Sequence, residues 1–155
     1  MHRVGIVPFD IKGDAIAILF VTSQTRGRWI LPKGVVKKKE THHAACEREG
    51  FEEAGVHGIV LEDFPITSLI TKRTDEGVQT IPVTYYPFLV TDQTDDWPEQ
   101  ARRDRHWALI QDASKVVYRA DFLNVIKQFE ELKPWIIEVA KSHKLKLQEE
   151  LTPAQ

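Results

Sequence analysis

Three glutamates, Glu49, Glu52 and Glu53, have the clearest capacity for chemistry in this chain. If residues 42–54 form a helix, the spacing i, i+3 and i+4 places their carboxylates on one face. Carboxylates this close repel one another unless a cation lies between them. Because Mg²⁺ and Mn²⁺ prefer carboxylate oxygens as ligands, the spacing indicates a candidate metal site. The alternative is a solvated acidic helix face with ordinary surface salt bridges.

The residues around the glutamates predict where this helix begins and ends. Thr41 can cap the first turn, and Gly55 suits the left-handed position that follows a helix. Gly50 costs about 1 kcal/mol inside a helix relative to alanine. Its presence predicts a position where a side chain is not wanted.

The same residues form a motif with fixed spacing. Its members are a glycine, a glutamate, an Arg-Glu pair, a Glu-Glu pair and a Gly-apolar pair, here Gly34, Glu40, Arg48, Glu49, Glu52, Glu53, Gly55 and Val56. The pattern resembles the signature of the Nudix hydrolases, with Gly50 where that family usually has an apolar side chain. Eight matching positions within 23 residues favour the metal site over the solvated acidic face.

The resemblance implies how a metal would be held. Glu49, Glu52 and Glu53 would bind Mg²⁺ or Mn²⁺, and a backbone carbonyl near Lys33 and Gly34 would add a ligand. Metal ions at such a site screen phosphate charge and lower the pKa of bound water. The implied activity is therefore hydrolysis of a phosphoanhydride bond.

The resemblance also implies catalytic roles beyond metal binding. Glu49 is a candidate for orienting or deprotonating the attacking water. Arg48 and Glu40 would form a salt bridge that steadies the loop before the helix. Glu76 and Glu99 fall in expected loops, where members of the family sometimes place an extra metal ligand or base.

Length and composition indicate one compact domain. The chain has 155 residues, 42% of them hydrophobic, which suits one core and is short for two domains. We therefore expect a single domain over residues 1–150 and a disordered tail over 151–155. The formal net charge is 21 minus 23, or −2, so no overall field attracts nucleic acid, and none is expected as a partner.

Other features bear on the compartment. Cys46 is the only cysteine, which excludes an internal disulfide and is typical of a reducing compartment. The chain shows neither an apolar run of about 18 residues nor a signal-peptide pattern. We expect a cytoplasmic protein, a monomer or homodimer, with no membrane partner and a small-molecule polyphosphate as substrate.

Hydrophobic periodicity predicts strands first and helices last. The β-rich runs cover residues 4–9, 15–21, 59–62, 66–72, 79–90 and 106–110. Lys12-Gly13-Asp14 is typical of a hairpin turn. Pro82 and Pro87 indicate an edge, a bulge or two separate pieces in the fifth run.

Helical periodicity dominates the C-terminal part. A short helix is expected from Asp112, and a longer one from a cap at Asp121 to Leu132. Pro134 would break or kink the pattern before a last segment over residues 135–147. This order predicts a mixed sheet flanked by helices, an α/β (α+β) arrangement that the resemblance narrows to the α/β/α sandwich of the Nudix fold.

Basic residues gather around the start of the motif. Six cations fall within fourteen residues: Arg26, Arg28, Lys33, Lys37, Lys38 and Lys39. A loop this basic beside metal-binding carboxylates suits a substrate with more phosphates than a simple nucleotide. The alternative for the run of three lysines is a solvated loop that only offsets nearby glutamates.

Further segments are similar to the diphosphoinositol polyphosphate phosphohydrolases, which also cleave dinucleoside polyphosphates. They cover residues 28–34, 44–45, 52–58, 96–97 and 103–107. The likeness implies that Arg102, Arg103 and Arg105 approach the substrate's phosphates, with ordinary surface arginines as the alternative. It favours these two substrate classes over damaged nucleoside triphosphates and nucleotide sugars. A noncatalytic nucleotide-sensing module of the same fold is the alternative outside enzymes.

Overall fold

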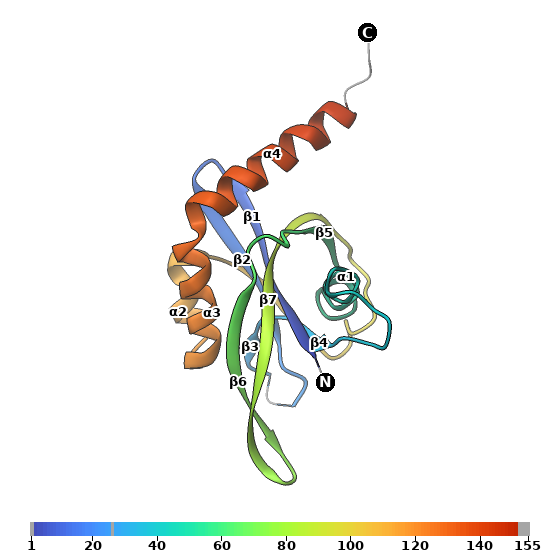
Figure 1. The fold of residues 1–155 in the computed structure, drawn as a ribbon, viewed down its shortest axis with the longest axis vertical. Helices are drawn as coiled ribbons and strands as arrows, with labels where there is room; N and C mark the ends of the chain where they lie inside the picture. The colour runs from blue at the N-terminus through green and yellow to red at the C-terminus, as the bar shows by residue number, and fades with distance from the viewer. Residues whose placement is uncertain (1, 26, 152–155) are drawn as a thin grey trace.

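The structure, a computed structural model, describes residues 2–25 and 27–151. A mixed sheet lies between helices, so the predicted α/β/α sandwich is confirmed (Figure 1). Helix α1 (His42–Ala54) covers one face, and α2 (Ala113–Val116) and α3 (Ala120–Glu131) lie on the other side. Helix α4 (Lys133–Leu151) follows α3 and extends beyond the sheet.

The sheet has a central path of strands in the order β3-β2-β1-β7-β5, with β4 beside β1, β6 beside β7 and β8 beside β2. The bounds are β1 (Arg3–Lys12), β2 (Ala15–Thr22), β3 (Trp29–Ile30), β4 (Lys33–Val35), β5 (Val56–Val60), β6 (Ile66–Thr74), β7 (Gly77–Gln93) and β8 (Arg105–Leu109). Strands β1 and β7 run parallel, whereas the other pairs are antiparallel. Each of the β-rich runs predicted from the sequence overlaps one of these strands. The two shortest strands, β3 and β4, carry too few residues to show a periodicity.

The turn predicted at Lys12-Gly13-Asp14 is confirmed. Lys12 pairs with Ala15 across the β1–β2 hairpin, and Gly13 has a φ of 60°. A positive φ is the conformation for which glycine carries no steric cost.

Strand β7 continues through both prolines without a break. Pro82 pairs with β6 on one edge, while pairing with β1 on the other edge begins only at Thr84. Pro87 lies where the antiparallel partner changes, after the last β6 pair at Tyr85 and before the first β5 pair at Phe88. Proline has no backbone N–H to donate, and both prolines lie where β7 lacks a paired strand on one of its edges.

Helix α3 packs its predicted apolar face on the sheet, but the predicted cap at Asp121 is wrong. The helix begins at Ala120, and Arg119 occupies the N-cap position without a side-chain capping bond. The Asp121 carboxylate accepts hydrogen bonds from the backbone N–H of Thr71, in the edge strand β6, and of Phe122. Asp121 thus ties α3 to the sheet edge.

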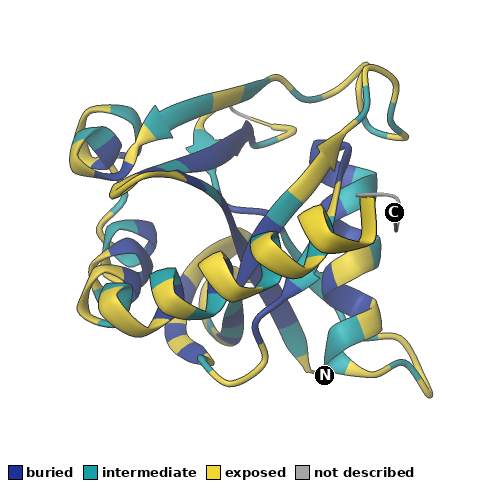
Figure 2. Cartoon of the chain, turned by 90° about the horizontal axis from the view of Figure 1, so that it is seen from above, coloured by how far each residue is buried: buried dark blue, intermediate teal, exposed yellow. Residues whose placement is uncertain are grey.

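Pro134 lies in the first turn of α4, where a missing N–H has no helical partner to lose. Helix α4 runs further than the predicted segment and includes Leu151, while residues 152–155 of the expected tail lie outside the described residues. Figure 2 shows that much of its surface is exposed. No helix in the described ranges has the length and apolarity needed to cross a membrane.

Two apolar clusters hold the layers together. The larger contains Phe9, Phe20, Phe122 and Phe129 on the α3 side, and the smaller lies under α1. Gly50 belongs to the α1 side: a Cβ there would lie 3.1 Å from Cδ1 of Ile6 and 3.5 Å from Cζ of Phe88. Close packing against the sheet therefore explains a glycine inside this helix.

Candidate metal and phosphate site

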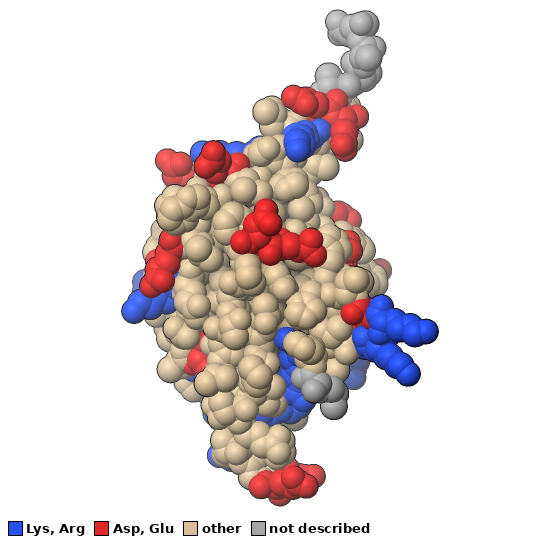
Figure 3. Space-filling view, in the orientation of Figure 1, with Lys and Arg blue, Asp and Glu red and all other residues tan. Residues whose placement is uncertain are grey.

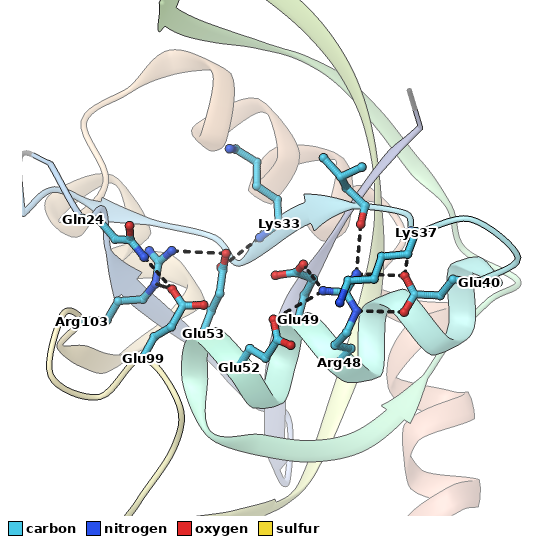
Figure 4. Close-up of polar contacts among 11 residues, drawn as sticks. Gln24, Lys33, Lys37, Glu40, Arg48, Glu49, Glu52, Glu53, Glu99 and Arg103 are labelled. Atoms are coloured by element: carbon cyan, nitrogen blue, oxygen red, sulfur yellow. Dashed lines mark hydrogen bonds and ion pairs between the residues drawn. The ribbon is translucent and has the colours of Figure 1, made fainter.

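Helix α1 begins and ends where the sequence predicts, which fixes the three glutamates in space. Thr41 accepts a hydrogen bond from the backbone N–H of Ala44 at 3.0 Å, and Gly55 ends the helix with a φ of 66°. Glu49 and Glu53 point from α1 toward β4, and Glu52 lies beside them on the same helix (Figure 4). Glu49 and Glu53 are buried, at 7% and 6% exposure.

Gly34, in β4, lies directly against Glu49. A Cβ at this glycine would be 2.0 Å from Oε1 of Glu49 and 2.2 Å from its carboxyl carbon. The motif glycine is therefore needed because the carboxylate occupies the space of a side chain.

Arg48 joins the loop before the helix to the glutamates. Its Nε and one terminal nitrogen bind the two oxygens of Glu40 at 2.8 and 2.9 Å, so the implied ion pair is present and bidentate. Arg48 also donates to Glu49 at 2.6 Å, to Glu52 at 3.4 Å and to the Val35 carbonyl at 2.9 Å. The hydrogen bonds from Arg48 lower the pKa of Glu40 to about 2, and those to Glu40 raise the pKa of Arg48.

A second arginine lies at the other end of the glutamate row (Figure 4). Arg103 donates to Oε1 of Glu53 at 3.3 Å and to Oε1 of Glu99 at 2.9 Å. Gln24 donates to the same Glu99 oxygen at 2.7 Å, and the backbone N–H of Lys33 donates to Oε2 of Glu53 at 3.2 Å. Both oxygens of Glu53 therefore have a fixed donor.

Burial dominates the electrostatics of the two inner carboxylates. Desolvation raises the pKa of Glu49, against the opposing effect of Arg48. Desolvation also raises the pKa of Glu53, which Arg103 lowers and the charges of Glu49 and Glu99 raise further. Because desolvation disfavours the ionised form of these two carboxylates, a cation bound beside them would stabilise it.

The donor set fits a hard divalent cation, although no ready-made coordination group is present. Within residues 2–25 and 27–151, no three histidine, cysteine or carboxylate side chains converge on one point. Arg48 and Arg103 bridge neighbouring carboxylates instead. Three carboxylates on one helix, two of them desolvated, nevertheless supply the oxygen ligands that Mg²⁺ and Mn²⁺ use.

The loop between β7 and β8 covers the C-terminal end of α1. The backbone N–H of Glu99 donates to the Glu52 carbonyl at 3.1 Å, and the Trp97 indole donates to the Glu53 carbonyl at 3.1 Å. Arg105 donates to the Ala54 carbonyl at 3.0 Å. These bonds satisfy carbonyls that a helix end leaves open, and they bring Glu99 to the site.

A basic pocket of about 730 Å³ lies between β6, the start of α3 and the segment from Ser23 to Lys33. Its described lining includes one carboxylate, Asp121, and five cations: Arg28, Lys33, Lys72, Arg73 and Arg119. Arg119 is engaged by Asp121 and by the Thr71 carbonyl. The other cations have no carboxylate partner within the described parts of the chain.

Lys33 connects the pocket to the glutamates. Its backbone N–H binds Glu53, while its side chain extends to the other side of β4 (Figure 4). Burial lowers the pKa of the Lys33 ammonium, and Lys72 acts in the same direction. Its ammonium forms no hydrogen bond or ion pair with the described residues, so an anion in the pocket would find it free.

The structure separates the predicted phosphate ligands that precede α1 into the pocket and the loop 37–39. Arg28 and Lys33 line the pocket, whereas Arg26 lies outside the described residues. The loop 37–39 is exposed, and Lys and Arg side chains project where this loop precedes α1 (Figure 3). It lies near Arg48, at the opposite end of the glutamate row from Arg103 (Figure 4).

Arg103 and Arg105 are occupied by protein groups. All of the contacts of Arg103 given above are to the chain itself, and its side chain is 9% exposed. Arg105 holds the Ala54 carbonyl and lies 4.0 Å from the centroid of the Trp97 ring. Both arginines stabilise the loop over the end of α1.

Sequence reasoning missed Gln24 and the β6 contribution to the pocket. Lys72 and Arg73 are adjacent cations at the end of the predicted run 66–72, and this pair was the available signal. Of the two loop glutamates considered, Glu99 joins the site, whereas Glu76 lies at the β6–β7 turn away from α1 (Figure 1).

Comparisons with known proteins agree with this geometry. The NUDIX domain family matches residues 1–132. Nudix hydrolase 12, mitochondrial, from Arabidopsis thaliana is 30% identical over 152 residues, which cover 90% of this chain and 74% of that protein. Diphosphoinositol polyphosphate phosphohydrolase 3-beta from Homo sapiens is 29% identical over 132 residues, with coverages of 81% and 77%.

A solved structure shares the fold. The C. elegans Ap4A hydrolase in a binary complex has a TM-score of 0.68 and 22% identity, and covers 84% of this chain and 96% of its own. Five further Arabidopsis Nudix hydrolases match over only 57% to 65% of their own lengths. Since the family match spans most of the sequence and curated relatives are named as hydrolases, the chain belongs to the Nudix hydrolase family.

Proposed function

We propose that this chain is a metal-dependent phosphohydrolase that cleaves a phosphoanhydride bond by attack of water on phosphorus. The observation that carries the proposal is the row of Glu49, Glu52 and Glu53 next to a basic pocket, with Lys33 common to both. Carboxylates that hold a dication beside unpaired cations suit a substrate in which the reacting phosphate is one of several.

The glutamates would hold Mg²⁺ or Mn²⁺, with a backbone carbonyl of Lys33 or Gly34 as a further ligand. When bound, the metal supplies charge neutralisation on the phosphates and a lower pKa for the attacking water.

The chain's own residues would orient the reacting groups. Arg48 contacts both Glu49 and Glu52, so it limits the separation of these carboxylates before a dication enters. Glu40 holds Arg48 from the opposite side. Glu49, buried against Gly34, is the candidate for orienting or deprotonating the water.

Diphosphoinositol polyphosphates are the substrate class that the pocket favours. Its volume of about 730 Å³ falls within the usual range of small-molecule sites, roughly 300–1,000 Å³. Lys33, Lys72 and Arg73 would neutralise phosphates remote from the cleaved bond. The human relative named above carries this activity in its name.

Dinucleoside polyphosphates are the second class, and one contact favours them. The guanidinium of Arg28 lies 4.8 Å from the centroid of the exposed Tyr118 ring, next to the pocket. A cation over an open aromatic ring forms a flat surface on which a nucleobase can stack. Ile30, Ile70 and Val78 add apolar lining for a base.

A panel of phosphoanhydrides tests the proposal. Wild-type protein is incubated with Mg²⁺ and then Mn²⁺, and released phosphate and nucleotide products are measured. We expect cleavage of one of the two favoured classes, and a loss of several orders of magnitude for the Glu52→Gln/Glu53→Gln double variant. Equal activity of the double variant and the wild type would overturn the proposal.

The same panel separates the alternatives. A preference for damaged nucleoside triphosphates or nucleotide sugars would replace the favoured classes. The absence of turnover with every compound under either metal would indicate a noncatalytic module. Replacing Lys37, Lys38 and Lys39 by alanine should weaken cleavage of highly phosphorylated inositols more than that of nucleoside triphosphates, and an unchanged preference would count against the inositol class.

A further inference from the structure

Arg103 is fixed on all sides by the protein. Its Nε binds Glu99 at 2.9 Å, one terminal nitrogen binds the Thr22 carbonyl at 2.8 Å, and the other binds Glu53 at 3.3 Å. Every guanidinium nitrogen therefore has an acceptor from the chain, and the side chain is only 9% exposed. Such an arginine has no free face for a phosphate.

The groups that hold Arg103 are themselves held. Thr22 ends β2, and its N–H and hydroxyl bond to the carbonyl and N–H of Asp104 at 3.1 and 2.9 Å. Glu99 is fixed by Gln24 at 2.7 Å and by the bond of its own N–H to α1. The guanidinium is thus anchored to the sheet and to the β7–β8 loop before it reaches Glu53.

We propose that Arg103 is a positioning residue, which aims Glu53 at the metal and holds the buried carboxylates together while no metal is bound. This inference rests on the proposed function. Arg103 fixes Oε1 of Glu53 and the Lys33 N–H fixes Oε2, so the carboxylate plane is set by two donors. Each oxygen keeps a lone pair for a cation.

Charge supports the same role. Arg103 is in contact with two carboxylates, Glu53 at 3.3 Å and Glu99 at 2.9 Å. Without it, Glu53 and Glu99 would repel each other and turn apart. The planar guanidinium of arginine donates to three acceptors in fixed directions. A lysine at this position would keep the positive charge but could not make the three hydrogen bonds in those directions.

Mn²⁺ binding in the absence of substrate is the decisive measurement. Free Mn²⁺ is titrated by electron paramagnetic resonance against wild type, Arg103→Gln and Arg103→Lys. Groups that orient metal ligands typically account for about 10–100-fold in affinity, and we expect a loss of that size for Arg103→Gln, with partial recovery for Arg103→Lys. Arg102→Gln, which changes the exposed neighbouring arginine, should bind as the wild type does.

The outcomes separate this inference from the proposed function. If the wild type binds no Mn²⁺, the proposed function fails. If it binds Mn²⁺ and Arg103→Gln binds equally well, the positioning role alone is overturned. A raised KM for substrate with unchanged Mn²⁺ affinity would instead assign Arg103 to phosphate binding and would also overturn it.

Folding is checked by circular dichroism and by thermal melting in EDTA. If Arg103→Gln does not fold, Arg103→Lys decides the question. Mn²⁺ affinity equal to that of the wild type in the folded lysine variant would then reject the role, and a several-fold loss would support it.

Discussion

Gly34 and Glu49 share one space: the carboxylate of Glu49 lies where a side chain on Gly34 would be, 2.0 Å from the position of a Cβ. The contact joins β4 to α1 at the centre of the glutamate row. Because Arg48 holds the same carboxylate at 2.6 Å, Glu49 cannot withdraw without breaking an ion pair. The position of this one carboxylate therefore depends on a strand, a helix and an arginine together.

Gly34→Ala should disable the site while the fold is retained. The new methyl group would displace Glu49, and we expect Mn²⁺ affinity or kcat to fall by about 10–100-fold. Metal titration and steady-state kinetics on folded protein check this. Gly50→Ala is the control, because its Cβ would meet Ile6 rather than a glutamate. Normal metal affinity in Gly34→Ala would contradict the argument.

Glu40→Gln should lower stability in a pH-dependent way. The pKa of Glu40 is lowered from 4.5 to about 2, so its ion pair stabilises the fold above pH 4.5 and is lost as the pH falls towards 2. We therefore expect a lower Tm for the variant at pH 7 and convergence with the wild type near pH 2. Thermal melts in EDTA measure the difference, with Glu130→Gln on the exposed surface of α3 as the control. A Tm difference that does not change with pH would contradict the assignment.

Local signals allowed the sequence to predict α1 and its glutamates in full. Thr41, Gly55 and the i, i+3, i+4 spacing all lie within one helix, where periodicity and capping are decided by near neighbours. The hairpin at Gly13 and the apolar face of α3 are local in the same sense. For this reason the motif and most strand positions could be predicted without the fold.

Long-range pairings were beyond the same reasoning. Arg103 and Glu53 are 50 residues apart, and Gln24 and Glu99 are 75 apart, so their contacts depend on how β2 and the β7–β8 loop meet α1. The misassigned cap at Asp121 has the same cause, because its hydrogen-bond partner Thr71 lies 50 residues away in strand β6. The basic pocket likewise combines cations of β6 and of the start of α3, which are far apart in the sequence, and only the adjacent pair Lys72 and Arg73 was visible without the fold.

Glu53→Gln should make the metal-free protein more stable as it removes activity. Burial raises the pKa of Glu53 from 4.5 to about 8. Between these values the unfolded chain loses this proton before the folded one, so wild-type stability falls as the pH rises from 4.5 to 8. Glutamine does not ionise, so the Glu53→Gln variant does not lose stability in this way as the pH rises.

We therefore expect the Tm of Glu53→Gln in EDTA to exceed that of the wild type by a margin that grows up to about pH 8. The control is Glu52→Gln, the same change at a less buried position on α1. A Tm of Glu53→Gln below that of the wild type at pH 8 would show that its bonds to Lys33 and Arg103 outweigh its desolvation.

Lys72→Ala/Arg73→Ala should change substrate preference more than catalysis. Each cation facing a phosphate about 4 Å away contributes roughly 1 kcal/mol in water, about fivefold in affinity. We expect KM for diphosphoinositol polyphosphates to rise at least about tenfold, with kcat nearly unchanged, because neither residue contacts the glutamates.

Nucleoside triphosphates, with fewer phosphates to reach the pocket, should show a smaller rise in KM for the same double variant. Steady-state kinetics on both substrates measures this, with Lys127→Ala/Lys146→Ala, at exposed positions of α3 and α4, as the matched loss of two charges. An equal rise for both substrates would show that the β6 cations act as a general field, and an effect confined to the 37–39 loop variant would move phosphate recognition to the opposite end of the glutamate row.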